Sequence, residues 1–388
     1  MHRRLKRYCA HASGAACSEA GHCDGRIFTH GRNVTTLHPH PAPARPDQAS
    51  PPQLPRVDPI AQLPILILFP HSRCNCRCVM CDIWRSTART ELAVADVARW
   101  TDEWRALGVK RVVLSGGEAL LHSHLWELCD HLRAANIGIT ILSTGLLLSR
   151  HAADLVRCCD DVVVSLDGPE PVHDRIRNVP RAYARLAEGV AAVKATGVGV
   201  QVTARCTVQR SNFTTLRATV AAALALGLDR ISFLAADVSS DAFNRPNGWD
   251  DERAGQVALE SADLPHLAAE LDALERDCAN EFASGFIAES PAKLRRTLYQ
   301  YYAALLGIGD FAPVTCNAPW VSTVIESDGT VRPCFFQPAL GNIHQAGSLA
   351  AILNAPDAIA WRQDLDVQRN EICRKCVCSL SLQSSPDA

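Results

Sequence analysis

Four cysteines lie within eight residues of the segment PHSRCNCRCVMCDIW, residues 70–84. They are Cys74, Cys76, Cys78 and Cys81. Disulfides between such close neighbours would constrain little of the chain, so a metal or iron–sulfur site is the better interpretation. The first, third and fourth cysteines have the spacing C-x3-C-x2-C. Three thiolates on a cluster of four irons leave one iron open to a small chelating molecule.

A second segment with chemical potential is SGGEAL, residues 115–120, which directly follows a strand-like run. Gly116 and Gly117 carry no side chain, so their backbone carbonyls would be exposed to a ligand, and Glu118 adds a carboxylate. Oxygen acceptors of this kind suit an ammonium group.

A third segment is VSLDGPEPVHDRIRN, residues 164–178. It follows another strand-like run and would deliver Ser165 and Asp167 to the same rim as the cysteines. His173, Asp174 and Arg177 in its HDRIR part are expected to order the loop rather than to perform chemistry.

The elements that must position these segments alternate from Pro64 onward. The strand candidates are 64–69, 111–115, 138–143, 161–166, 198–208 and 229–235. Helical patterns lie near 93–107, 122–135, 149–158, 181–195 and 213–226. This alternation predicts βαβ units and a parallel sheet, here an α/β partial (β/α)6 TIM-like barrel with functional groups on loops at the C-terminal strand ends.

The chain divides into four predicted regions. Residues 1–60 are a proline-rich tail predicted to be disordered, and 61–245 form the partial barrel. Residues 246–310 read as a helical linker without strands. Residues 311–388 form a small cysteine-rich domain with a hairpin turning at Asp328-Gly329.

Composition excludes several classes of function. The 388 residues carry a formal charge of −2, which gives no electrostatic surface for nucleic acid, and no run is long and apolar enough to span a membrane. The N-terminus has basic residues but no apolar core after them, so we expect no secretory signal. The 17 cysteines are then expected to stay reduced in the cytoplasm and to serve metal binding or catalysis. Cys129, Cys158, Cys159, Cys206 and Cys278 lie in helix or strand patterns and are expected to be core residues.

The cysteine loop, the GGE segment and the SLDGP…HDRIR stretch together resemble the radical S-adenosylmethionine (SAM) enzymes. Within that superfamily they resemble the branch that contains the molybdenum-cofactor cyclase, the sulfatase-maturating enzymes and peptide-modifying enzymes. The resemblance covers about residues 64–240 and a second part at the C-terminus. It implies that Cys74, Cys78 and Cys81 ligate a catalytic [4Fe–4S] cluster. Its reduction, by a partner such as flavodoxin or ferredoxin, would cleave bound SAM to methionine and a 5′-deoxyadenosyl radical.

The same resemblance implies roles for the cofactor-binding residues. Gly116, Gly117 and Glu118 would hold the SAM amino group, and Ser165 would contact its ribose or carboxylate end. Arg205 alternates with threonines on the fifth strand. It would clamp a carboxylate of SAM or substrate if its face lines the barrel, and would cover a helix if it faces outward.

The sequence departs from the family pattern at three places. Met80 stands where an aromatic residue usually precedes the third cysteine, Ala119 replaces the usual proline after GGE, and Thr144 replaces the usual asparagine after the third strand. Cys76 has no counterpart in the family and is interpreted as a spare thiol.

The C-terminal cysteines resemble the SPASM/twitch extension of these enzymes. A full SPASM domain needs about seven cysteines for two auxiliary clusters, and five are present here. We therefore expect one auxiliary [4Fe–4S] cluster on Cys316, Cys334, Cys373 and Cys376, with Cys378 as the substitute ligand.

Zinc remains an alternative for both cysteine sets. A four-cysteine zinc site would also fold the small C-terminal hairpin domain, although paired C-x2-C motifs are the usual signature and only one is present. In the first loop His71 could complete a zinc site, but this leaves GGE and the Ser165 loop without a role.

Three functions fit these residues. The first is a radical SAM enzyme, of oxidoreductase type, acting on a small biosynthetic molecule, and the second is one that modifies a ribosomally made peptide. The third is a metal-binding scaffold without catalysis. The absence of an N-terminal peptide-recognition domain and the single auxiliary cluster favour the small molecule.

Overall fold

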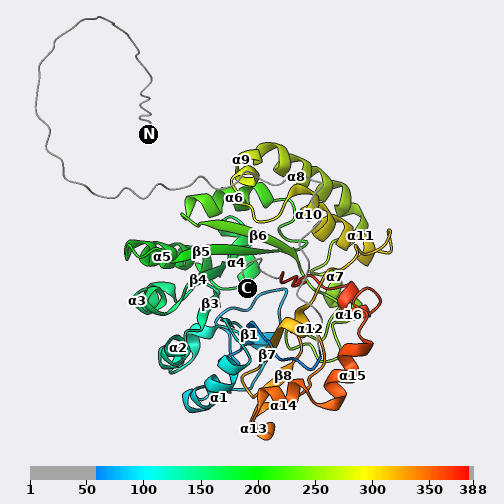
Figure 1. Ribbon diagram of the computed structural model, residues 1–388. Helices are drawn as coiled ribbons and strands as arrows, with labels where there is room; N and C mark the ends of the chain where they lie inside the picture. Colours follow the sequence, from blue (N-terminus) through cyan, green and yellow to red (C-terminus); the bar gives the residue numbers. More distant parts are fainter. Residues whose placement is uncertain (1–57, 384–388) are drawn as a thin grey trace, which may run out of the picture. The chain divides into compact units, whose positions relative to one another are not determined.

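The computed structural model describes residues 58–383, so the tail predicted over residues 1–60 lies outside the described residues except for its last three. The described residues fall within one compact unit. Its centre is a nine-stranded sheet of order β6-β5-β4-β3-β2-β1-β7-β8-β9 (Figure 1). The strands are β1 (Ile65–Leu68), β2 (Arg111–Leu114), β3 (Gly138–Ser143), β4 (Asp161–Ser165), β5 (Gln201–Val208), β6 (Arg230–Ala235), β7 (Ser322–Ile325), β8 (Thr330–Arg332) and β9 (Gly341–Asn342).

Strands β1 to β7 pair in parallel, and only β8 and β9 run antiparallel to their neighbours. The sheet is open at β6 and β9, so the predicted partial barrel is confirmed. All six predicted strands are present. The hairpin is confirmed as well, since Gly329 takes a left-handed φ of 85° between β7 and β8.

Helices cover the outer face of the sheet. The barrel part contains α1 (Val94–Ala106), α2 (Leu125–Ala134), α3 (Leu148–Cys158), α4 (Glu170–Arg177), α5 (Ala182–Ala195) and α6 (Leu216–Ala225). The five predicted helices correspond to α1, α2, α3, α5 and α6. Helix α4 was not predicted, because its segment opens with Gly-Pro and contains a second proline. Both prolines lie at the helix start, where their missing N–H groups cost nothing.

The predicted helical linker contains no named strand among its described residues. It comprises α7 (Asp251–Gly255), α8 (Leu264–Asp277), α9 (Ala279–Ala283), α10 (Pro291–Leu294), a π-helical segment (Arg295–Gln300) and α11 (Tyr301–Leu305). The C-terminal region adds α12 (Ala318–Val321), α13 (Ile343–Ala346), α14 (Leu349–Leu353), α15 (Pro356–Asp364) and α16 (Glu371–Arg374).

The C-terminal region extends the barrel sheet directly. Strand β7 pairs with β1 in the register Ile65↔Ser322 to Leu68↔Ile325. No pattern in the sequence predicts this pairing, and the division of the chain into four regions stays a prediction.

Each barrel strand alternates between a buried face and a partly open face. On β5, Val202, Ala204 and Cys206 are buried against the helices, while Thr203 and Arg205 point to the other side. The five cysteines predicted to be core residues are all buried. Among the described residues, no helix has the length and apolar character needed to cross a membrane.

Candidate functional site

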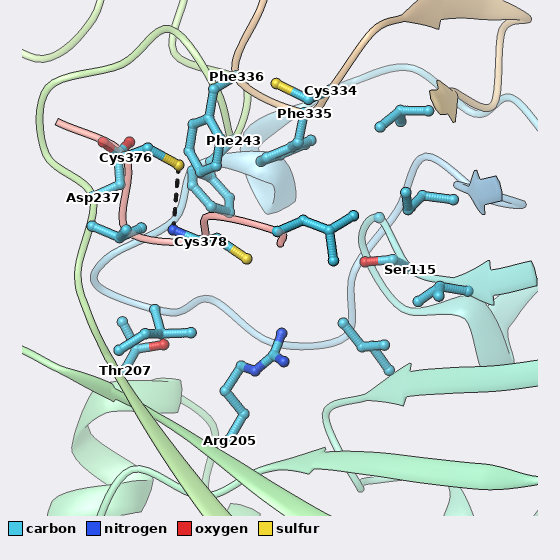
Figure 2. Close-up of a pocket in the computed structure, with 18 of the residues that line it drawn as sticks. Ser115, Arg205, Thr207, Asp237, Phe243, Cys334, Phe335, Phe336, Cys376 and Cys378 are labelled. Atoms are coloured by element: carbon cyan, nitrogen blue, oxygen red, sulfur yellow. Dashed lines mark hydrogen bonds between the residues drawn. The ribbon is translucent and has the colours of Figure 1, made fainter. Parts of the chain in front are cut away.

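A cavity of about 580 Å³ lies along the inner face of the sheet and the loops that leave its C-terminal ends (Figure 2). It brings together nearly all the predicted site residues. Those that line it are Cys74, Cys78, Cys81, Gly116, Gly117, Ser165, Arg205, Cys316, Cys334, Cys373 and Cys376. Residues as far apart in the sequence as Cys74 and Cys376 therefore line the same cavity.

The cysteine loop leaves the end of β1. Cys74, Cys78 and Cys81 line the cavity, whereas Cys76 is buried outside its lining. This is the division that the sequence predicts between three ligands and one spare thiol. The roles of these residues stay predictions, but their placement fits a cluster held by three thiolates.

The thiols of this loop differ in acidity. Burial raises the pKa of Cys74 above its ordinary value and that of Cys81 to about 12. A hydrogen bond with Cys76, helped by the charge of Arg177, lowers the pKa of Cys78 to about 7. Bound iron would therefore have to displace protons from at least two of the three ligands, as thiolate coordination requires.

The GGE segment packs directly on the cysteine loop. The Glu118 amide donates to the Arg73 carbonyl at 2.9 Å, and a Cβ on Gly117 would lie only 2.1 Å from that carbonyl oxygen. Only glycine fits there. Gly116 has a φ of 97°, the left-handed region that favours glycine.

The carboxylate of Glu118 is fully buried and does not line the cavity. It accepts hydrogen bonds from Ser143 Oγ at 3.0 Å, from the Thr144 amide at 2.7 Å and from the Thr144 hydroxyl at 2.6 Å. Burial raises its pKa, and these donors oppose the shift. The side chain thus ties the loops after β2 and β3 together. The residues of this segment that line the cavity are Ser115, Gly116 and Gly117.

Thr144 also reaches the cysteine loop, since its hydroxyl lies 2.9 Å from Asn75 Oδ1. The residue that departs from the family pattern therefore connects the second, third and first loops. This contact gives the substitution a structural role.

Ser165 and Arg205 are direct partners in the β4–β5 register, and both line the cavity. Figure 2 shows the Arg205 side chain extending from β5 into the cavity beside Thr207. The inward alternative for this strand face is therefore confirmed. A cation in this position can attract a carboxylate, while the predicted contact with SAM or substrate stays a prediction.

The C-terminal cysteines line the same cavity. The Cys378 amide donates to Cys376 Sγ at 3.4 Å, as Figure 2 shows, and Gln337 Nε2 donates to Cys373 Sγ at 3.3 Å. Burial raises the pKa of Cys334 to about 12. Because Cys376 and Cys378 both reach the cavity, Cys376 stays the predicted ligand and Cys378 its substitute.

The placement of the cysteines and of His71 can be compared with what the two zinc alternatives require. Within residues 58–383, no three His, Cys, Asp or Glu side chains converge on a single metal ion. A four-iron cluster spreads its thiolates more widely than one tetrahedral zinc ion does. His71 does not line this cavity, and both of its ring nitrogens have protein partners, since Nδ1 accepts from the Arg73 amide at 2.7 Å and Nε2 lies 3.0 Å from Glu91.

Sequence reasoning missed an aromatic cluster in the wall of the cavity. Phe69 and Phe243 pack edge-on against Phe335 with ring centroids 5.4 and 4.8 Å apart, and Phe336 follows directly. The same four phenylalanines also line a second cavity of about 880 Å³. The sequence does contain an indication of this cluster, because two phenylalanines directly follow Cys334 and one phenylalanine ends the first predicted strand.

Two segments of the chain match known protein families. Residues 68–222 match the radical SAM superfamily, and residues 316–377 match SPASM, an iron–sulfur cluster-binding domain.

The chain is similar to known proteins over different lengths. The chain is 30% identical over 270 residues to PqqA peptide cyclase of Ruegeria pomeroyi, covering 68% of this chain and 65% of that protein. It is 30% identical over 162 residues to GTP 3′,8-cyclase of Rhizobium leguminosarum bv. trifolii, covering 39% of this chain and 46% of that protein. The chain thus spans less than two thirds of either relative. The solved structure of native anSMEcpe with bound AdoMet and Cp18Cys peptide shares the fold, with a TM-score of 0.57 and 19% identity over 82% of this chain and 92% of that one.

Proposed function

Because the chain belongs to the radical SAM superfamily and carries a C-terminal SPASM domain, we propose that it is an enzyme that uses reductive SAM cleavage to modify a ribosomally made peptide. The observation that supports this most is that both cysteine sets line one cavity. A substrate in that space would be within reach of both groups at once.

The residues present fit the groups that the two domains imply. Cys74, Cys78 and Cys81 would hold the [4Fe–4S] cluster, which supplies the electron that cleaves SAM to methionine and a 5′-deoxyadenosyl radical. The carbonyls of Gly116 and Gly117 would accept from the SAM ammonium group.

The opposite side of the cavity would orient the remaining parts of the ligand. Ser165 and Arg205 would face the ribose or carboxylate end of SAM, or a carboxylate of the substrate. Cys316, Cys334 and Cys373 with Cys376 would hold one auxiliary cluster. The aromatic cluster would exclude water from the reacting atoms, where a radical must be protected from side reactions.

The choice of a peptide departs from the preference of the sequence analysis for a small molecule. The alignment with PqqA peptide cyclase covers 68% of this chain, whereas the alignment with GTP 3′,8-cyclase covers 39%. The second cavity supports the choice, because it adjoins the first at Phe69, Phe243 and Phe335 and is lined by many serines. An extended peptide could lie there and place one side chain past the phenylalanines.

A small molecule is the second candidate. It is favoured by the relation to GTP 3′,8-cyclase, although that similarity covers only 39% of this chain. The volume of the first cavity falls in the range of small-molecule sites.

The radical chemistry is tested with anaerobically reconstituted protein, dithionite and SAM. We expect 5′-deoxyadenosine from the wild type and from Cys76→Ala, and at least a 100-fold lower rate from Cys78→Ala. Loss of activity in Cys76→Ala with retention in Cys78→Ala would show that the wrong three cysteines were assigned.

The substrate is tested by adding synthetic peptides that correspond to short reading frames encoded beside the gene. The proposal predicts a mass change in one of them, dependent on SAM and the reductant. If these peptides stay unchanged while a small-molecule extract of the source cell yields a SAM-dependent product, the second candidate is correct.

A further inference from the structure

Arg177 is a buried guanidinium in direct contact with a predicted cluster ligand. It is the last residue of α4 and is only 6% exposed. Its Nη1 donates to Cys78 Sγ at 3.4 Å, and its Nη2 lies 2.5 Å from Asp167 Oδ2. Asp167 is fully buried and accepts from the Thr207 amide at 2.9 Å. The guanidinium is therefore held between a carboxylate and a sulfur.

The backbone fixes this contact independently of the side chains. The amide of Arg77 donates to the carbonyl of Arg177, and the amide of Val79 donates to that of Ile176, both at 3.0 Å. These two bonds attach the cysteine loop, on either side of Cys78, to the end of α4. These bonds keep the backbone of Cys78 beside that of Arg177, and the ion pair with Asp167 orients the guanidinium toward the sulfur.

We propose that Arg177 is a positioning residue that raises the reduction potential of the cluster held by Cys74, Cys78 and Cys81. This inference rests on the proposed function, which assigns a cluster to these cysteines. Reduction adds negative charge to the cluster, and a buried positive charge beside one of its sulfurs favours that reduced state. Hydrogen bonds to ligand sulfurs act in the same direction.

Asp167 has two opposing effects in this arrangement. It orients the guanidinium toward Cys78, and its negative charge offsets part of the effect of Arg177 on the cluster. Removing the charge of Asp167 while keeping its shape should therefore raise the potential, whereas removing the charge of Arg177 should lower it.

Other cations near the loop touch its backbone rather than its sulfurs. Arg245 Nη2 donates to the Met80 carbonyl at 2.6 Å, and Arg253 Nη2 donates to the Val79 carbonyl at 2.5 Å. Arg253 is 24% exposed, so water screens its charge more than that of Arg177. Arg253→Gln is thus a matched control that removes one positive charge from the same loop.

The test is an EPR-monitored redox titration of reconstituted wild type, Arg177→Gln, Arg177→Lys and Arg253→Gln, with iron content measured for each. The signal that changes when SAM is added identifies the relevant cluster. We expect Arg177→Gln to keep its iron and shift this midpoint to lower potential. Arg177→Lys, which keeps the charge, should shift less, and Arg253→Gln should stay near wild type.

An unchanged midpoint in iron-replete Arg177→Gln overturns the inference, as does a shift in Arg177→Lys as large as that in Arg177→Gln. If Arg177→Gln fails to hold a cluster, the same titration of Asp167→Asn tests the inference. A midpoint potential above that of the wild type supports it, and an unchanged or lower midpoint potential overturns it. A wild type that lacks any SAM-sensitive cluster refutes the proposed function itself, an outcome distinct from the others.

Discussion

The close contact between Gly117 and the cysteine loop makes Gly117→Ala the sharpest test of how the site is assembled. An alanine Cβ would lie 2.1 Å from the Arg73 carbonyl oxygen and 2.6 Å from its carbon. Cβ atoms essentially never approach other atoms closer than 3.0 Å, so the two loops must separate by at least the difference between 3.0 and 2.1 Å, which is 0.9 Å. Both partners are backbone, so no flexible side chain can absorb the movement.

The displacement acts on two predicted functions together. The same Arg73 carbonyl accepts the Glu118 amide, a bond worth about 1 kcal/mol that would be strained or lost. More important, the ammonium acceptors at Gly116 and Gly117 would move relative to Cys74 by roughly 1 Å. A misplacement of that size costs about 100-fold in rate. We therefore expect the rate of 5′-deoxyadenosine formation to fall by about that factor.

The assay is single-turnover SAM cleavage with dithionite, with iron content and SAM affinity measured in parallel. Gly255→Ala is the matched control, because no atom lies within 4 Å of the added Cβ and its φ is not positive. It should retain the wild-type rate. If Gly117→Ala cleaves SAM as fast as Gly255→Ala, the contact between the two loops is not what positions the cofactor.

Three further predictions concern the metal content and the stability of the chain. Anaerobic reconstitution should give about eight irons per chain, while about four irons with one zinc would refute the auxiliary cluster. A folded variant with both Cys334→Ala and Cys373→Ala, shown to bind SAM, should still form 5′-deoxyadenosine but little product, and wild-type turnover would contradict a role in catalysis. Burial lowers the pKa of His173 from its ordinary value to about 3. As the pH falls, the unfolded chain therefore binds this proton before the folded chain does, and the folded state loses stability below about pH 6.5. Between pH 7 and 5 the urea-unfolding free energy of the apoprotein should fall by about 2 kcal/mol more in the wild type than in His173→Gln, and equal slopes would show that His173 is not neutral in the fold.

The sequence predicted the barrel strands well because their signals are local. Each strand is a short apolar run between amphipathic helical segments, and each run ends at a segment with polar or glycine residues. The site residues from those segments reach one cavity because parallel strands end at the same edge. The side of the sheet on which Arg205 lies could not be predicted from the sequence, because an alternating strand does not show which of its two faces lines the interior.

The buried charges around the cysteine loop could not be predicted in the same way. Charged residues are mostly exposed, so the sequence alone does not indicate that Arg177 and Arg245 are buried. Their burial depends on partners that are distant in sequence, as when Arg245 pairs with Asp237 at 3.0 Å and stacks 3.7 Å above the Trp249 ring. No periodicity in the chain encodes such contacts.

The position of the auxiliary site follows from one pairing that the sequence does not show. Strand β7 lies beside β1 in parallel, and the Phe69 amide continues this pairing by donating to the Ile325 carbonyl at 2.9 Å. Phe69 begins the cysteine loop, and its ring packs against Phe335, the residue after Cys334. The C-terminal cysteines are thus fixed beside the first cysteine loop by continuous backbone hydrogen bonding and one aromatic contact. A C-terminal domain joined only by a flexible linker could not hold two clusters at a constant separation, whereas one built onto the same sheet can. A cluster held by the C-terminal cysteines would therefore keep a constant position at the cavity that the first cysteine loop also lines.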